Sequence, residues 1–516
     1  MLSAFPPEVV LNILGFLPAY SLPALECASS AWKHFFDIHQ SIIYQSAATF
    51  HGIASPGSPI EDVARAHISP WLDNVTNWKD LCRKYIVLEK SWAGKGVTEI
   101  TFGLDMAAWI SAFKLDEEQR TIICTTRDEG WLKVICAKTG DLLWDHPAGL
   151  DAPVSAQFDY SHGFIAFPRN AMQVEIWQRS TDYATSSFTP APDADQTTAW
   201  QPYAHIPAAR GHYRPFTVLS SLSPNLIDAF RFVFPYLLGI SEMDYFVSIW
   251  DVTTAALVQT LTLTTPEHDF HDPRFGPRIR SLDMTQEHIL VCSITRLGIY
   301  CRKTGEAVFQ SSIPPSNIDS LFPHVTSSME CVLGRPLAWL KMPGSIVTSY
   351  DIRPRDPNDQ SSSMQNGFRA AHLSPCGNNL VVISSHGRVY YIPSFSNSSD
   401  MRSRIRIVDM EGDTTVTAFD GKRVALYSGS ELYCISLNDS PTAVLPPRSQ
   451  PICHSFGFPS TSIQHIASFS SPTEYNHNIY VTSVQLTSTS LWVHSFIHSP
   501  GRRVPRLHCV DFSRHI

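Results

Sequence analysis

Apolar residues recur every three or four positions through the first fifty residues of the chain. The series from Val9 to Leu17 has the spacing of one helical face, and two prolines precede it where a first helical turn tolerates them. Pro18 ends this helix, a second short helix is expected from an N-cap at Ser21, and a third is expected over residues 32–48.

Three short helices cannot bury all of this apolar surface among themselves, because so small a unit has too little interior. The remaining surface must be covered either by the rest of the chain or by another protein. The helical period alone leaves both alternatives open.

The pattern changes beyond residue 96. Short runs rich in Val, Ile, Thr and aromatic residues there alternate with clusters of Gly, Pro, Asn, Asp and Ser, which is typical of strands joined by turns. One unit recurs: a strand is followed by a turn and, in the clearest copies, by a second strand. The copies of the first strand lie at residues 134–136, 175–177, 248–251, 298–300, 349–351, 388–390, 431–433 and 490–492.

This repeat resembles the blades of a WD-type β-propeller, each of which is a four-stranded antiparallel sheet of about 40–45 residues. The resemblance implies a mainly β fold with a propeller of seven blades. Eight blades are the alternative count, and an array of β-sandwiches is the alternative fold. Only Trp250-Asp251 is a Trp-Asp pair at the end of such a strand. Residues 185–215 and 314–366 exceed the spacing and are interpreted as insertions or degenerate blades.

An ordered set of short motifs runs through the first helical unit. In chain order these are Phe5-Pro6-Pro7-Glu8, Ile13-Leu14-x-x-Leu17, Leu22-x-x-Leu25 and Ser29-x-x-Trp32. They resemble an F-box, whose first position is usually leucine where this chain has phenylalanine. The resemblance implies docking onto the adaptor of an SCF-type ubiquitin ligase and, through that adaptor, onto a cullin. The side chains that it assigns to adaptor binding are Phe5, Pro6, Glu8, Val9, Ile13, Leu14, Leu17, Leu22, Leu25 and Trp32.

A Gly-, Ser- and Pro-rich segment at residues 52–59 separates this unit from a further helical stretch. That stretch includes Trp78 and Leu88 in a broad apolar stripe, and it resembles the linker between an F-box and a propeller. A helical linker would hold the two domains at a set distance and angle, unlike a flexible tether. A helix packed on the large domain is the alternative. The expected domains are 1–50 (F-box), 51–96 (helical linker) and 97–516 (propeller).

Composition narrows the classes of partner. The 516 residues have a formal net charge of -8 and no dominant block of like charge, so we expect no nucleic-acid partner. Eleven cysteines without a C-x-x-C pair favour a reducing compartment. The start of the chain lacks the pattern of a signal peptide, and the longest apolar run is about half of the roughly 20 residues that span a bilayer. We therefore expect a cytoplasmic and/or nuclear protein without a membrane partner.

The sequence offers little catalytic chemistry. It has no G-x-S-x-G, H-E-x-x-H or P-loop motif, and we expect neither an enzyme nor a cofactor. Two histidines and two aspartates between His268 and Asp272 have the chemistry of zinc ligands. They lie in a Pro-rich connection where polar residues are expected anyway, so no metal site is expected. Cys292 and Cys301 lie in apolar strands and are expected to pack in the core.

Arg402, Arg404 and Arg406 alternate with other residues and would lie on one face of a strand. The simple interpretation is a solvated strand face. The sharper hypothesis is a substrate-binding site for an acidic or phosphorylated segment, because a guanidinium group pairs bidentately with phosphate and carboxylate.

Together these patterns predict a non-catalytic adaptor, the substrate-recognition subunit of an SCF-type ubiquitin ligase, with a protein substrate on the propeller. Two other classes stay open. One is a propeller scaffold whose N-terminal helices serve only as a cap, and the other is an enzyme with a site in the propeller channel.

Overall fold

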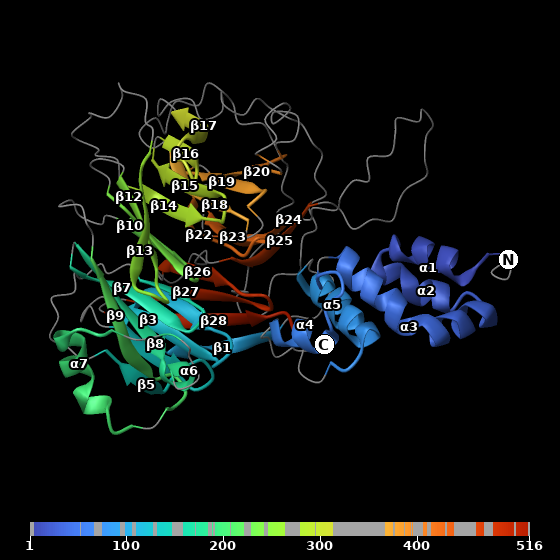
Figure 1. The fold of residues 1–516 in the computed structure, drawn as a ribbon, viewed down its shortest axis with the longest axis horizontal. Coiled ribbons are helices and arrows are strands. Elements are labelled where there is room, and N and C mark those ends of the chain that lie inside the picture. Colours follow the sequence, from blue (N-terminus) through green and yellow to red (C-terminus); the bar gives the residue numbers. More distant parts are fainter. Residues whose placement is uncertain are drawn as a thin grey trace.

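A helical unit lies beside a larger unit of strands (Figure 1). The computed structural model describes residues 5–51, 53–66, 75–92, 99–105, 110–126, 132–146, 158–170, 172–183, 188, 191–206, 208–220, 229–241, 246–263, 279–294, 296–312, 367–374, 377–385, 387–393, 395, 406–409, 414–428, 431–437, 461–468, 478–499 and 502–513.

Within these ranges the strands form seven antiparallel sheets of four strands each. One strand of each sheet contacts the equivalent strands of the two neighbouring sheets, and these inner strands form a closed ring. A ring of four-stranded sheets is a β-propeller, so the prediction of seven blades is confirmed and the alternative of β-sandwiches is wrong.

Each blade has an inner, a second, a third and an outer strand. The inner strands are β2 (Ile110–Asp116), β6 (Asp159–Ser161), β10 (Ala229–Val233), β14 (Ile279–Met284), β18 (Phe368–Leu373), β22 (Thr414–Phe419) and β26 (Asn478–Leu486). The second strands are β3 (Thr121–Thr126), β7 (Phe164–Asn170), β11 (Tyr236–Ile240), β15 (His288–Ser293), β19 (Leu380–Ser384), β23 (Arg423–Ser428) and β27 (Ser490–Ser499). The third strands are β4 (Leu132–Cys136), β8 (Gln173–Arg179), β12 (Phe246–Asp251), β16 (Arg296–Cys301), β20 (Arg388–Ile392), β24 (Glu431–Leu437) and β28 (Arg502–Asp511). The outer strands are β5 (Leu142–Asp145), β9 (Tyr213–Ser220), β13 (Ala256–Thr262), β17 (Ala307–Ser312), β21 (Arg406–Asp409), β25 (Thr461–Ser468) and β1 (Glu99–Asp105).

The seventh blade is assembled from both ends of the propeller sequence. Its outer strand, β1, precedes all the other strands, whereas β26, β27 and β28 are the last three. β1 pairs antiparallel with β28, with Glu99 opposite Asp511 and Asp105 opposite Arg506. Pairing between the two ends of the sequence therefore closes the ring.

Burial explains the apolar runs that fill the middle of each blade. Every residue of β3 and of β15 is buried, because neighbouring blades cover both faces of the sheet. A strand covered on both faces reads as a continuous apolar run, as in residues 289–292, and not as an alternating one. The outer strand β13 alternates between exposed and half-buried residues.

Six of the eight repeated runs in the sequence lie in the third strands of the first six blades. The run at 490–492 lies at the start of the second strand β27, so its interpretation as an equivalent repeat is wrong. The equivalent feature is Asp511 at the end of β28, which accepts hydrogen bonds from the backbone N–H and hydroxyl of Ser513, both at 2.7 Å. Asp251 does the same for Thr253 at the end of β12. The run at 349–351 lies outside the described residues.

The helical unit precedes the propeller. Its helices are α1 (Pro7–Gly15), the 3-10 turn η2 (Ala19–Ser21), α2 (Leu22–Glu26), α3 (Ser30–Phe50), α4 (Ile60–Ala66) and α5 (Trp78–Trp92). Pro7 stands in the first turn of α1, where its missing N–H costs nothing. Ser29 caps α3 by accepting a hydrogen bond from the Trp32 N–H at 3.2 Å. Ser21 does not cap α2 as expected, because its hydroxyl donates to the carbonyl of Pro18 at 2.7 Å.

The long spacing at residues 185–215 is an insertion within the second blade. Between β8 and β9 the chain forms α6 (Ser180–Tyr183), α7 (Ala194–Trp200) and the 3-10 turn η4 (Gln201–Tyr203), which lie at the edge of the propeller far from the helical unit (Figure 1). Residues 314–366 lie outside the described residues.

A chain of ion pairs joins the inner strands of neighbouring blades. Lys114 lies 2.8 Å from Asp159, Arg231 lies 3.1 Å from Asp159, and Arg231 lies 3.3 Å from Asp283. Each carboxylate also accepts a hydrogen bond from a backbone N–H of the next inner strand, at Phe232 (2.9 Å) and Leu373 (3.0 Å). An inner strand has no neighbour on its channel side, so these carboxylates pair N–H groups that the sheets leave unpaired.

Replacement of Asp159 by asparagine should destabilise the propeller by about 2–3 kcal/mol at pH 7. This is less than the roughly 3–5 kcal/mol typical of a fully buried ion pair, because Lys114 and Arg231 keep partial contact with water. Burial raises the pKa of Asp159, but Lys114 and Arg231 outweigh it and lower the pKa to about 2. The stabilisation is therefore present above the ordinary pKa of the group and is lost as the pH falls toward 2.

Urea unfolding of both proteins at pH 7 and near pH 3 measures this difference. Asp195→Asn, at a carboxylate that is 72% exposed, is the matched control and should change stability little. An Asp159→Asn protein as stable as the unchanged protein at pH 7 would contradict the prediction.

Candidate functional site: the exposed helical face and its junction with the propeller

One face of α1 exposes large apolar side chains. Val9 and Ile13 lie one turn apart in α1, Phe5 precedes the helix and Phe16 is its C-cap. The exposed fractions of Phe5, Val9, Ile13 and Phe16 are 54%, 41%, 55% and 77%. The opposite face is the core face, where Val10 and Leu14 are buried. Four exposed large side chains in one stripe exceed the scattered singles of an ordinary surface and indicate an interaction site.

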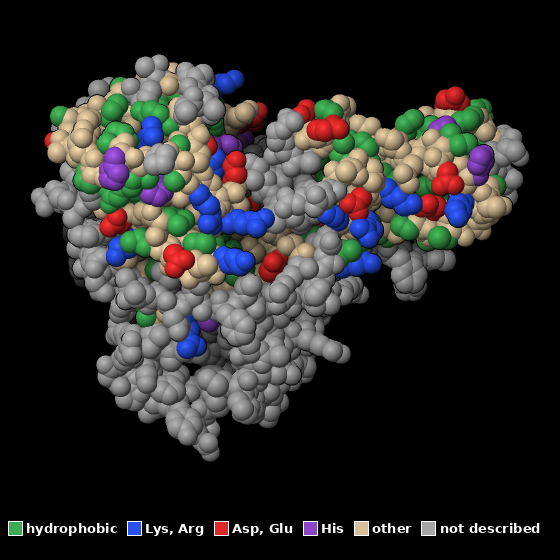
Figure 2. All heavy atoms as spheres, turned by 90° about the horizontal axis from the view of Figure 1, so that it is seen from below, with side chains coloured by type: hydrophobic (Ala, Val, Ile, Leu, Met, Phe, Trp, Pro, Cys, Tyr) green, Lys and Arg blue, Asp and Glu red, His purple; other side chains and the backbone are tan. Residues whose placement is uncertain are grey.

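Helix α3 also exposes large apolar side chains. Ile38 and Ile42, one helical turn apart, are 61% and 52% exposed, and α1 packs on α3 with Gly15 close to Ser46. Figure 2 shows hydrophobic side chains at the surface of the helical unit, interspersed with charged ones. We call the exposed set Phe5, Val9, Ile13, Phe16, Ile38 and Ile42 the apolar face.

The ten residues assigned to adaptor binding divide into three groups. Phe5, Pro6, Glu8, Val9 and Ile13 are exposed, Leu17, Leu25 and Trp32 are half-buried, and Leu14 and Leu22 are buried. The last two lie in the core beneath the apolar face and not on it, because α3 and η2 cover them. Adaptor contact by these ten residues stays a prediction.

Sequence reasoning missed three members of the apolar face: Phe16, Ile38 and Ile42. The exposure of Ile38 and Ile42 could have been predicted from the sequence. Phe36, Ile43 and Ala47 recur at helical spacing and form the buried face of α3, so positions 38 and 42 lie on its opposite, exposed face. For Phe16 the signal was weaker, because it follows the last residue of α1 as its C-cap.

A polar cluster fastens α2 and α3 to the linker helix α5. Lys79 lies 2.8 Å from the carboxylate of Glu26, which also accepts a hydrogen bond from the Tyr44 hydroxyl at 3.3 Å. The Cys82 thiol donates to the Tyr44 carbonyl at 3.3 Å, and burial raises the pKa of this thiol to about 12. The thiol therefore stays protonated at neutral pH and is a packing group.

The end of α5 is wedged between the last two blades. The Trp92 ring stacks on Phe512 with 3.6 Å between ring centroids, and its indole N–H donates to the Ser488 carbonyl at 3.3 Å. On the other side the guanidinium of Arg423 lies 4.4 Å from the Trp92 ring centroid and 2.5 Å from the Glu89 carboxylate. Trp92 is fully buried, so this junction is an interior and not a surface contact.

The charge of Arg423 is held in place by its neighbours. Burial alone lowers the pKa of a guanidinium, but the carboxylates of Glu89 and Asp420 outweigh it and raise the pKa of Arg423.

One continuous apolar core runs from α1 and α3 through α5 into the last two blades. The helical unit is thus fixed on the propeller by packing.

The other candidate sites from the sequence lie largely outside the described residues. Of the predicted arginine face only Arg406 lies in a described strand, the outer strand β21, while Arg402 and Arg404 lie outside the described residues. The cluster from His268 to Asp272 also lies outside them, and no group of metal-ligating side chains occurs within the described ranges.

Cys292 and Cys301, the two cysteines expected in the core, differ in burial. Cys292 is buried in the core as expected. Cys301 is only half-buried, at the end of β16, where hydrogen bonds from Thr304 lower the pKa of its thiol.

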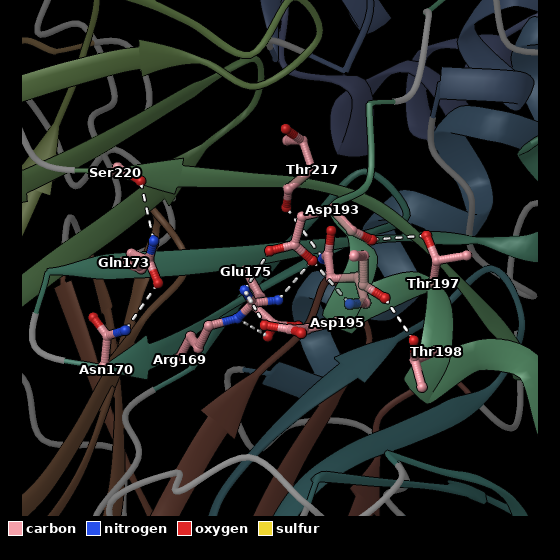
Figure 3. Close-up of polar contacts among 12 residues, drawn as sticks. Arg169, Asn170, Gln173, Glu175, Asp193, Asp195, Thr197, Thr198, Thr217 and Ser220 are labelled. Carbon is pink, nitrogen blue, oxygen red and sulfur yellow. Dashed lines mark hydrogen bonds and ion pairs between the residues drawn. The ribbon is translucent and has the colours of Figure 1, made fainter.

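Figure 3 shows a buried ionic network in the second blade. Arg169 pairs with Glu175 at 2.5 Å and with Asp193, while the Trp177 indole N–H donates to Glu175 at 2.8 Å. Asp193 also caps α7 by accepting from the Gln196 N–H at 2.8 Å. Burial raises the pKa of Glu175, but its hydrogen bonds outweigh this and lower it. These carboxylates hold the insertion on the blade, and none is poised as a base near neutral pH.

Residues 2–44 match the family model of the F-box domain. The chain is an F-box protein with a β-propeller. F-box domains typically bind the adaptor of SCF-type ubiquitin ligases, and an F-box joined to a propeller is typical of adaptor proteins without enzymatic activity. None of the helices in the described part of this F-box protein is long and apolar enough to cross a membrane.

No curated protein matches the sequence. Among solved structures, the F-box protein is similar to the β-propeller domain of Cps50 (Swd1) from Myceliophteria thermophila. The likeness covers 80% of this chain and 99% of that one, at 10% identity and a TM-score of 0.43. The strand order within each sheet and the closed ring of inner strands define the propeller.

Replacement of Trp92 by alanine should uncouple the helical unit of the F-box protein from its propeller. The variant loses the stack on Phe512 and the ring beneath Arg423, at a cost of about 3–5 kcal/mol. Differential scanning calorimetry should then resolve a separate, earlier transition of the helical unit.

The control is Trp200→Ala, at a half-buried tryptophan of α7 in the insertion. It should lower stability less and leave the coupling unchanged. An unaltered melting profile of the Trp92 variant would show that the junction does not hold the two units together.

Proposed function

We propose that this protein is the substrate-recognition subunit of an SCF-type ubiquitin ligase. The apolar face of its F-box docks on the ligase adaptor, which links it to a cullin, and the propeller holds a protein substrate. The observation that carries the proposal is the stripe of exposed apolar residues on α1, within the segment that matches the F-box domain.

The exposed stripe argues against the alternative of a helical cap. A cap would turn its apolar face toward the propeller, because covering that face is its purpose. In this chain α5 makes the contact with the last two blades, whereas Val9, Ile13 and Phe16 face solvent. The surface of α1 is therefore available for another protein.

The proposed mechanism needs no catalytic residue in this chain. An adaptor that binds the ligase at one end and a substrate at the other turns ubiquitin transfer into a local event at raised effective concentration. The packed junction at Trp92 supports this role, since it holds the propeller at a fixed position relative to the docking face. We therefore propose a non-enzymatic protein that acts in the cytoplasm, the nucleus or both.

Two parts of the proposal concern the substrate. The substrate is a protein, and an acidic or phosphorylated segment is the proposed ligand of Arg402, Arg404 and Arg406. No nucleic acid or membrane takes part. Charge reversal at the three arginines is the test of that segment's role.

Paired substitution of Val9 and Ile13 by aspartate should abolish adaptor binding. Both side chains are exposed, so the helical core stays intact while two apolar anchors become charges. A few such anchors carry most of an interface's free energy, so we expect an affinity loss of about 100-fold or more. Isothermal titration calorimetry of the full chain with the purified adaptor measures it.

The control is Val258→Asp with Val308→Asp, at valines of the outer strands β13 and β17 that are 49% and 44% exposed. It adds the same charge at similar exposure and should bind the adaptor normally. Absence of binding by the unchanged chain, or equal binding by both variants, would refute the adaptor role.

A further inference from the structure

A histidine at the end of α3 holds the connection between α1 and α2 in place. His51 follows α3 directly as its C-cap, and its Nε2 atom accepts a hydrogen bond from the backbone N–H of Ala19 at 2.9 Å. Ala19 is fully buried and begins η2, the turn between α1 and α2. This bond therefore ties the α1–α2 connection to a residue 32 positions further along the chain.

The direction of this hydrogen bond defines the protonation state of the ring. A backbone N–H can only donate, so the Nε2 atom of His51 carries no proton and the imidazole is neutral. A protonated imidazole has N–H groups at both ring nitrogens and offers no acceptor. The N–H of Ala19 would then be a buried donor without its acceptor, which costs the folded state free energy.

The surroundings of His51 also favour the neutral ring. Its ring centroid lies 6.1 Å from that of Tyr85 in α5, and the ammonium nitrogen of Lys422, in the turn between β22 and β23, lies 5.8 Å from the same tyrosine ring. Burial lowers the pKa of His51, the Glu89 carboxylate opposes this effect, and the positive charge of Lys422 adds to it. Glu89 is itself paired with Arg423 at 2.5 Å, and burial raises the pKa of Tyr85, so this phenol stays neutral.

The contact between His51 and Ala19 is therefore sensitive to mild acid. A histidine in an unfolded chain takes up its proton near about pH 6.5, whereas His51 in the folded helical unit takes it up only at lower pH. The stabilisation is thus fully present above the ordinary pKa of histidine and is lost as the pH falls below it. Between about pH 7.5 and about pH 5.5 this one group can shift the opening equilibrium of the helical unit by up to about tenfold.

We propose that His51 is a pH-sensitive switch of the helical unit, whose protonation releases the Ala19 N–H and loosens the connection between α1 and α2. Because α1 carries the exposed side chains of Val9 and Ile13, the looser connection weakens adaptor docking in mild acid. The effect on adaptor docking rests on the proposed function, whereas the effect on the helical unit does not. His51 lies beyond residues 2–44, so the segment that matches the F-box domain does not include this switch.

Amide hydrogen exchange of the full chain, measured by mass spectrometry of peptides that cover residues 16–22, tests the switch. Protection relative to an unstructured peptide at the same pH should fall by up to about tenfold between about pH 7.5 and about pH 5.5. In His51→Gln the side-chain amide oxygen can still accept from Ala19 but does not titrate, so protection should fall by less than about twofold. Equal losses in this variant and the unchanged chain, or no loss in the unchanged chain, would overturn the proposal.

The matched control is His34→Gln, at an exposed histidine of the same helix. It also removes one imidazole and should lose as much protection in acid as the unchanged chain. A control that abolishes the acid effect would assign that effect to another histidine and contradict the proposal.

A second measurement needs no variant and remains decisive if His51→Gln does not fold. Deuterium exchange at the imidazole C2 atom of the unchanged chain reports the pH at which each histidine is half-protonated. The midpoint of His51 should lie below that of the exposed His34. A midpoint equal to or above that of His34 would show that the fold does not hold His51 neutral.

Calorimetric titration with the purified adaptor at the same two pH values separates the switch from the adaptor role. The unchanged chain should lose more affinity in acid than His51→Gln does. If the adaptor binds at neither pH, the proposed function fails while hydrogen exchange still decides on the switch. If adaptor binding is normal but hydrogen exchange shows no acid effect, the switch fails and the proposed function stands.

Discussion

Closure of the ring by β1 is the constraint on which the rest of this structure depends. The strand that follows the linker helix directly becomes the outer strand of the last blade, paired with β28. The helical unit is therefore attached at the seam of the propeller, where both ends of its sequence meet. Blades six and seven consequently supply the surface on which α5 packs, through Arg423, Ser488 and Phe512.

This arrangement fixes the exposed helical surface relative to the propeller. A continuous apolar core joins α1 and α3, which carry the apolar face, through α5 to the propeller. In the proposed role, fixed geometry favours transfer to a bound substrate, because a tether that moves freely lowers the effective concentration.

Charged side chains at the centre of the propeller join its inner strands. Asp159 and Asp283 satisfy backbone N–H groups that the inner strands leave unpaired, and Lys114 and Arg231 neutralise those carboxylates.

The sequence by itself determined the class of each unit. Helical spacing and the order of the motifs from Phe5 to Trp32 indicated the F-box, and apolar runs with repeated turns indicated a propeller of seven blades. Local patterns suffice there because each helix, and each blade except the seventh, is built from consecutive stretches of the chain.

Only the tertiary structure decided which side chains face solvent or one another. In the structure Leu14 and Leu22 are buried in the core and Phe16 is exposed. The feature of the seventh blade that is equivalent to the repeated runs is Asp511, and not residues 490–492. The ion pairs at Asp159 and the stack of Trp92 on Phe512 join residues of different blades or units, separated by up to several hundred positions. Periodicity carries no information about such contacts, because the packing of distant segments, and not local spacing, brings them together.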